Sequence, residues 1–238
     1  DIEAIIGPAD DLAQSLFDTN FDNLDGPDAP NLEIRELDQK LIITLQNPES
    51  SNNYAESYEE TDPQITSLGS FTDTTYKFQG YQVYQLADAQ VTASDLDDPE
   101  KATLIFQCDI EDGVDTLYNF FQDGGTGTFA SEVQVIGDDE GITRSFEVVE
   151  DRFAEGNTEL VNHTEYYFMA VAYAYNNYRS FIDTVPDDAF QRTQYLIGGN
   201  IKPYSAIPHK STINENGFVL NAEYGDGVPV TRLEGRGN

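Results

Sequence analysis

Aspartate and glutamate side chains gather in five short clusters along this sequence, and carboxylate oxygens are the ligands that calcium prefers. None of the clusters follows the D-x-[DN]-x-[DN]-G order of a calcium loop, so a solvated acidic turn is the simpler interpretation of each. Calcium is therefore an optional ligand and no cofactor is required, while the metal-binding residues stay unknown. The clusters are Asp22/Asp25/Asp28, Asp95/Asp97/Asp98, Asp109/Glu111/Asp112, Asp138/Asp139/Glu140 and Asp187/Asp188.

Catalysis by carboxylate pairs or by a thiol is not indicated. Glycoside hydrolysis needs two carboxylates at a set separation across a cleft, and sequence spacing cannot select such a pair from 44 acidic residues. A thiol nucleophile needs a nearby base, yet neither His163 nor His209 sits in a catalytic signature. Cys108 lies in an apolar, strand-like run and is predicted to be a small buried hydrophobic residue. The chain is predicted not to be an enzyme.

Tyrosine rings offer another chemistry, because exposed aromatic faces stack on sugars much as they stack on other rings. Tyr173, Tyr175 and Tyr178 follow one another around the end of an apolar run and could form a platform for surface glycans. Packing of the same rings against the face of a sheet is the favoured alternative.

Composition limits the classes of partner. The 238 residues are 39% hydrophobic and include 14 Tyr and 14 Phe, which is enough to bury a core. The formal charge of −32 would repel nucleic acid and anionic lipid surfaces. No run approaches the roughly 20 apolar residues of a membrane-spanning helix. The first residues lack the basic region of a signal peptide, and the chain is expected to be a fragment of a longer precursor.

The elements that must position these side chains are organised around residues 160–175. Tyr166 to Tyr175 alternate with period two, without Gly, Pro or Lys, which predicts a central strand of an antiparallel sheet. The spacing Leu160-x5-Tyr166 resembles the corner between strands E and F of a fibronectin type III or immunoglobulin-like sandwich. This resemblance implies that the tyrosine hydroxyl bonds to the chain a few residues upstream. Leu160, Tyr166 and Phe168 are therefore predicted to be structural residues.

Further strands are predicted on both sides of this corner. Residues 31–37 and 40–45 form a predicted hairpin that resembles strands A and B of a fibronectin type III domain. The order Gly80-Tyr81-x-Val83 within 76–86 resembles its strand C, which makes Tyr81 and Val83 structural residues as well. Strict alternation places Phe78 and Gly80 on one face and Tyr81 and Val83 on the other. Strands E and G are predicted at 142–149 and 201–207.

The predicted fold is thus an all-β, antiparallel β-sandwich of the fibronectin type III or immunoglobulin-like kind, with inserted hairpins and long acidic loops. Residues 1–29 are predicted to be a linker with a short helix at 10–17, and 30–210 the sandwich. An insertion around 95–141 carries strands at 101–110, 116–121 and 131–136, and residues 46–75 are predicted to be a long acidic loop. Residues 211–238 are predicted to connect to a following domain.

Several motifs in order along the chain resemble large secreted proteins of Bacteroidota that are exported by the type IX secretion system. This resemblance implies an extracellular or cell-surface location, with neighbouring domains and the secretion machinery as partners. A non-catalytic structural or adhesion module is the expected function, and a carbohydrate-binding accessory domain of a secreted hydrolase is the alternative. A hydrolase with an unidentified carboxylate pair is a third reading. The motifs are Asp25-Gly-Pro-Asp-Ala-Pro30, Tyr76-x-Phe78-x-Gly80-Tyr81, Val161-Asn-His163, Tyr166-Tyr-Phe-Met-Ala-Val-Ala-Tyr173, Ile207-Pro-His-Lys210, Glu223-Tyr-Gly-Asp-Gly227 and Thr231-Arg-x-Glu-Gly235.

Overall fold

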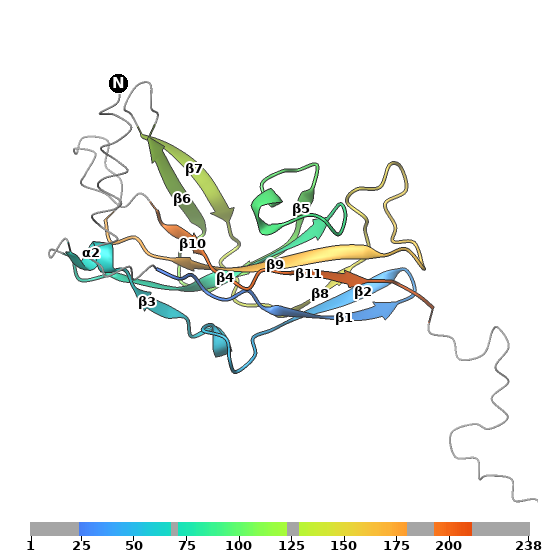
Figure 1. Ribbon diagram of the computed structural model, residues 1–238, viewed down its shortest axis with the longest axis horizontal. Helices are drawn as coiled ribbons and strands as arrows, with labels where there is room; N and C mark the ends of the chain where they lie inside the picture. The colour runs from blue at the N-terminus through green and yellow to red at the C-terminus, as the bar shows by residue number, and fades with distance from the viewer. Residues whose placement is uncertain (1–23, 68–70, 123–128, 180–192, 211–238) are drawn as a thin grey trace, which may run out of the picture.

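Antiparallel strands account for nearly all the regular structure in the computed structural model, which describes residues 24–67, 71–122, 129–179 and 193–210 (Figure 1). The helix predicted at 10–17, most of the linker predicted at 1–29 including Asp22, the Asp187/Asp188 cluster and the connector predicted at 211–238 lie outside these residues. Helix in the described part is limited to α2 (Pro63–Ser67) and two short 3-10 turns, η1 (Tyr54–Glu56) and η2 (Ala93–Asp95). The all-β class is confirmed, and the arrangement fits a β-sandwich.

The smaller of the two main sheets has the order β1-β2-β8. Strands β1 (Asn31–Leu37) and β2 (Lys40–Gln46) form the predicted hairpin, and Gln39 in its turn has a φ of 52°. Strand β8 (Ser145–Val148) pairs with the outer edge of β2. The buried side chains of β2, which are Leu41, Ile43 and Leu45, all point toward the second sheet.

The larger sheet is built on two long strands, β4 (Thr75–Leu86) and β9 (Tyr166–Tyr175), which pair along most of their length. The other edge of β4 pairs first with β3 (Glu59–Thr61) and then with β5 (Ala102–Asp109). The other edge of β9 pairs with β11 (Pro203–Ala206) and β10 (Tyr195–Ile197). The tyrosine-rich strand therefore has partners on both edges, as the sequence predicts.

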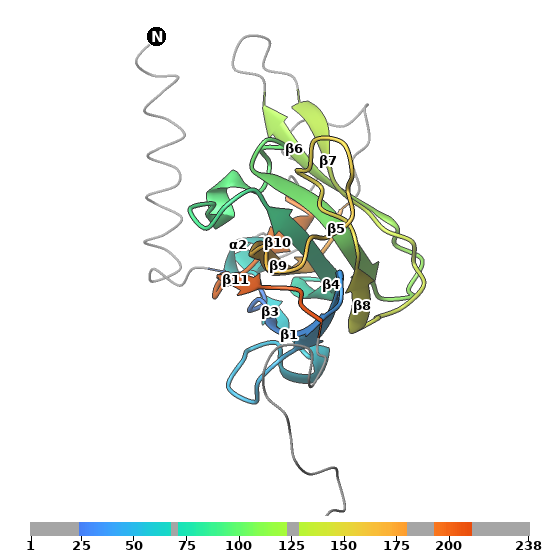
Figure 2. The ribbon, with the colours of Figure 1, turned by 90° about the vertical axis from the view of Figure 1, so that its right-hand side faces the viewer.

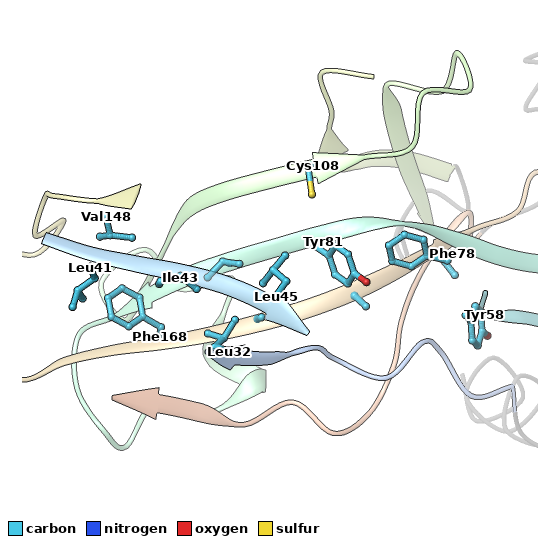
Figure 3. Packing of buried hydrophobic residues seen from close by; sticks show 14 of the residues in the cluster. Leu32, Leu41, Ile43, Leu45, Tyr58, Phe78, Tyr81, Cys108, Val148 and Phe168 are labelled. Atoms are coloured by element: carbon cyan, nitrogen blue, oxygen red, sulfur yellow. The ribbon is translucent and has the colours of Figure 1, made fainter. Parts of the chain in front are cut away.

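The two sheets share one hydrophobic core. Alternate residues of β9 face it, from Tyr166 and Phe168 to Ala174, and they meet the apolar side chains of β2 (Figure 3). Leu41, Ile43 and Phe168 are each 0% exposed. Full burial of one such side chain stabilises the fold by about 1.5–3 kcal/mol, so the facing rows of β2 and β9 contribute strongly to stability.

Strict alternation fails in β4, where the predicted faces are wrong. The register against β9 shifts between Phe78 and Gly80, so Phe78, Tyr81 and Val83 all face the core. The rings of Phe78 and Tyr81 lie 4.8 Å apart between centroids. A β-bulge adds one residue to a strand and reverses the alternation beyond it. Gly80 suits this place because a Cβ there would collide with the carbonyl oxygen of Cys108 and the ring of Tyr173.

The outer face of the larger sheet is also covered. Met169 packs against Leu86, Val91 and Ala102, and Tyr173 packs against two residues of the inserted segment described next. Strands buried on both faces have nearly continuous apolar sequences, which explains the composition of residues 166–175.

The predicted insertion divides into two parts. Strand β5 extends the larger sheet, whereas β6 (Thr116–Gln122) and β7 (Phe129–Ile136) form a separate two-stranded ribbon. The ribbon stands away from the two sheets in both views (Figures 1 and 2). Leu117 and Val135 at its base are the residues that cover Tyr173.

Two local expectations need correction. The segment 46–75, predicted to be a loop without strands, contains β3, η1 and α2, which are too short to show a periodic pattern. Strand β10 was not predicted, because its three residues follow a polar stretch. No helix in the described residues has the length and apolar character that a membrane crossing needs.

Candidate functional site

The corner before β9 has the hydrogen bond that the sequence predicts. The backbone N–H of Val161 donates to the hydroxyl oxygen of Tyr166 at 2.9 Å. Leu160 is 0% exposed, Tyr166 is 6% exposed, and the N–H of Leu160 donates to the carbonyl of Val149 at 3.1 Å. The ring of Tyr166 thus belongs to the core while its hydroxyl fixes the turn, which is a structural role.

Neighbouring turns are tied to the same corner. The Asn162 amide accepts a hydrogen bond from the N–H of Gln39 at 2.8 Å and donates one to Asp38 at 2.6 Å. His163 has a φ of 67°, and its N–H donates to the carbonyl of Pro208 at 2.8 Å. The corner therefore joins the β1–β2 turn to the end of β11.

Tyr81 and Val83 lie in the core, 1% and 0% exposed. The Tyr81 hydroxyl accepts a hydrogen bond from the Asn47 amide at 2.5 Å and donates to Glu56 at 3.4 Å. Glu56 also pairs with the Arg144 guanidinium, whose Nε lies 2.7 Å away. Burial raises the pKa of Tyr81 well above its usual range, so the hydroxyl stays protonated and holds this network together.

Cys108 is buried, as predicted, with 6% of its surface exposed. Its thiol donates to the carbonyl of Thr143 at 3.3 Å, and burial raises its pKa. A thiol with a raised pKa is a poor nucleophile, because the thiolate is the reactive form. His209 contacts the carbonyl of Ile207 and the Glu36 carboxylate, so its described partners are structural.

The structure brings two of the acidic clusters together, and their carboxylates accept backbone hydrogen bonds. Asp109 is 2% exposed and accepts from the N–H groups of Asp138 and Asp139, each at 3.2 Å. Asp139 accepts in turn from Asp112 at 2.8 Å and from Gly113 at 3.0 Å. Burial raises the pKa of Asp109, although these hydrogen bonds act in the opposite direction. These carboxylates join the turn after β5 to the turn after β7.

The remaining described clusters are also engaged in turns. Asp95 caps η2 by accepting from the N–H and hydroxyl of Thr92, at 2.9 and 2.7 Å, and pairs with Lys101. The hydrogen bond from Lys101 holds the pKa of Asp95 below its usual range. Asp28 and Asn52 exchange hydrogen bonds between two loops. Within the described residues, no three His, Cys, Asp or Glu side chains are grouped to hold a metal ion.

The tyrosines at the end of β9 pack against neighbouring elements. Tyr173 is 0% exposed, and its ring centroid lies 5.5 Å from that of Tyr195. Tyr178 contacts the ring of Phe71 edge-on at 4.5 Å. Tyr173 therefore cannot belong to an exposed platform, because the base of the β6–β7 ribbon covers it.

An open hollow of about 460 Å³ lies where β3, the start of β4 and the end of β9 meet. Tyr175 forms part of its wall, and most other lining groups are polar. Several of these groups already have partners: Lys77 pairs with Glu59 at 3.7 Å, and the Gln79 amide donates to Asp112 at 3.2 Å. A sugar binding here would compete with these interactions.

The chain matches no protein-family model, no curated protein sequence and no solved structure.

Proposed function

We propose that this chain is a non-catalytic structural and adhesion module of a large extracellular protein, with a fibronectin type III-like sandwich as its framework. The observation that carries the proposal is the corner hydrogen bond between Val161 and Tyr166 at the entry to a strand with partners on both edges. Strands β1, β2 and β8 would correspond to A, B and E, and β4, β9 and β11 to C, F and G.

The use of the polar side chains supports the same proposal. Asp95, Asp109 and Asp139 each accept hydrogen bonds that stabilise turns, and Cys108 donates to a carbonyl. A catalytic or binding group needs a free face toward its substrate. These side chains join loops to one another, which supports a structural role for them.

The proposed location is the outer surface of a bacterial cell, after export by the type IX secretion system. The order of the motifs in the sequence supports this location. The charge of −32 is compatible with a protein that is exposed to solvent and does not bind nucleic acid or anionic lipids. Neighbouring domains of the same precursor and the secretion machinery are the proposed partners. Antibody labelling of intact cells of the source organism tests the location, because an intracellular protein would be labelled only after permeabilisation.

A carbohydrate-binding role is the second candidate, and the hollow beside Tyr175 is the observation that favours it. Affinity electrophoresis through gels that contain soluble polysaccharides separates the two roles. A spacer migrates at the same rate in every gel, whereas a binding module is retarded by its polysaccharide. Retardation that disappears in the Tyr175→Ala variant would replace the structural proposal with the carbohydrate-binding one.

A further inference from the structure

The β6–β7 ribbon is fixed to the body only at its base. Leu117 and Val135 are 1% and 3% exposed and pack on Tyr173. Two residues after Leu117, the Asn119 amide oxygen accepts from the N–H groups of Gln194 and Tyr195 at 3.0 and 3.1 Å. These contacts set the direction of the ribbon, which then leaves the sheets (Figure 2).

Apolar side chains remain exposed along the ribbon. Ile136 is 72% exposed, Phe121 53% and Val133 48%. The register pairs Ile136 with Thr116 and, after a shift between Leu117 and Tyr118, Val133 with Tyr118. Because of this shift, Val133 and Ile136 share the face opposite Leu117 and Val135. A two-stranded ribbon is marginally stable by itself, and a partner that covered its exposed apolar side chains would stabilise it.

The outer edge of β7 has no strand partner in the described part of the chain, where β7 pairs only with β6. The Ile136 carbonyl at the end of β7 accepts a hydrogen bond from the Gln107 amide at 2.6 Å, so an added strand would pair with the residues before it. The far edge of β6, by contrast, forms a bridge between Asn119 and Thr193. A strand edge that pairs with no other strand is a template for an added strand.

Charge limits which strand can be added. Residues 102–143 contain nine Asp and Glu and no Lys or Arg. A second copy of the chain would bring another charge of −32 to the same surface, so self-pairing is opposed by repulsion. A basic segment would be attracted to this surface, and its apolar side chains could cover Val133 and Ile136.

We propose that β7 binds an extended, basic segment of a partner protein as the third strand of the ribbon. The partner is recognised by backbone pairing along β7, by apolar contacts with Val133 and Ile136, and by lysine or arginine side chains near the acidic residues. This inference goes beyond the structural role, which would stand even if the ribbon bound nothing.

A short peptide in which valine and lysine alternate is the probe, and the whole chain at physiological salt is the target. Calorimetry measures the affinity, and amide hydrogen exchange locates the contact. We expect slower exchange within 129–136 on binding. A second peptide with every other amide N-methylated keeps the charge and side chains but loses one row of donors. It should bind at least about tenfold more weakly, equivalent to a loss of about 1.4 kcal/mol.

Two double variants with the same composition complete the test. Val133→Thr with Ile136→Thr removes apolar contacts from the ribbon, whereas Val149→Thr with Ile207→Thr removes them from other surfaces, where these residues are 44% and 40% exposed. We expect at least about a tenfold loss of affinity for the first variant and less than about a twofold loss for the second. Absence of binding, equal binding of the N-methylated peptide, protection at another edge or equal losses in both variants would overturn the proposal.

Discussion

Replacing Tyr166 by phenylalanine removes one hydroxyl group and leaves the ring in the core. The hydroxyl accepts one hydrogen bond, from the N–H of Val161 at 2.9 Å, and the residue is 6% exposed. A net hydrogen bond contributes about 0.5–1.5 kcal/mol, and an unsatisfied buried donor costs about 1–3 kcal/mol. The Val161 side chain is 57% exposed, so water can reach part of this turn. We therefore expect Tyr166→Phe to lower the free energy of unfolding by about 1–2 kcal/mol.

Urea unfolding followed by circular dichroism measures this change. The slope of the free energy with urea is about 2–3 kcal/mol per molar for a domain of this size, so the midpoint should fall by about 0.5 M. The neighbouring variant Tyr167→Phe is a matched control, because its hydroxyl donates to Glu165 at an exposed position. It should change stability by less than about 0.5 kcal/mol. Equal midpoints for Tyr166→Phe and the wild type would refute a stabilising corner.

Three further perturbations test other parts of the structure. Gly80→Ala should lower the free energy of unfolding by about 1–3 kcal/mol in the same urea assay, because the added methyl group meets the Cys108 carbonyl. Gly199 has open space around it, so the control Gly199→Ala should change this free energy by less than about 0.5 kcal/mol. Burial raises the pKa of Tyr84 to about 12 and moves those of Tyr173 and Tyr195 further in the same direction, so these hydroxyls ionise more readily in the unfolded chain. Their contribution to stability is fully present below pH 10 and falls by about 1.4 kcal/mol per pH unit for each tyrosine above it. The phenolate absorbance of these three tyrosines, obtained by difference from variants with phenylalanine at each position, should therefore rise together with unfolding and not before it. Calcium should raise the melting temperature by about 3 °C or more if one site binds only the folded chain, and equal curves with calcium and with sodium chloride of the same ionic strength would remove that site.

The strand pattern of the core could be predicted from sequence because it depends on local alternation. Residues 166–175 alternate without interruption, and both of their faces are buried. The corner depends on Leu160 and Tyr166, which are close in sequence and leave a recognisable spacing. These features need only short-range information.

The bulge in β4 could not be placed in the same way. One added residue near Gly80 reverses the alternation, and the glycine was the only local sign of it. The sequence also contained no local sign that the outer face of the larger sheet is covered, because Leu117 and Val135, which pack on Tyr173, come from distant segments. The acidic clusters posed the same difficulty, since Asp109 bonds to the turn at Asp139 and not to its own neighbours.

Amide hydrogen exchange on the whole chain tests most directly that the tyrosine-rich strand β9 is the buried centre of the fold. Strand β9 pairs with β4 along most of one edge, and its other edge pairs with β11 at residues 166–169 and with β10 at residues 173–175. Its side chains are covered on both faces. We predict that residues 168–173 exchange through global unfolding and are among the slowest in the chain, whereas the outer edge of β7 exchanges faster. Exchange in β9 as fast as in β7 would contradict a structural framework built around that strand.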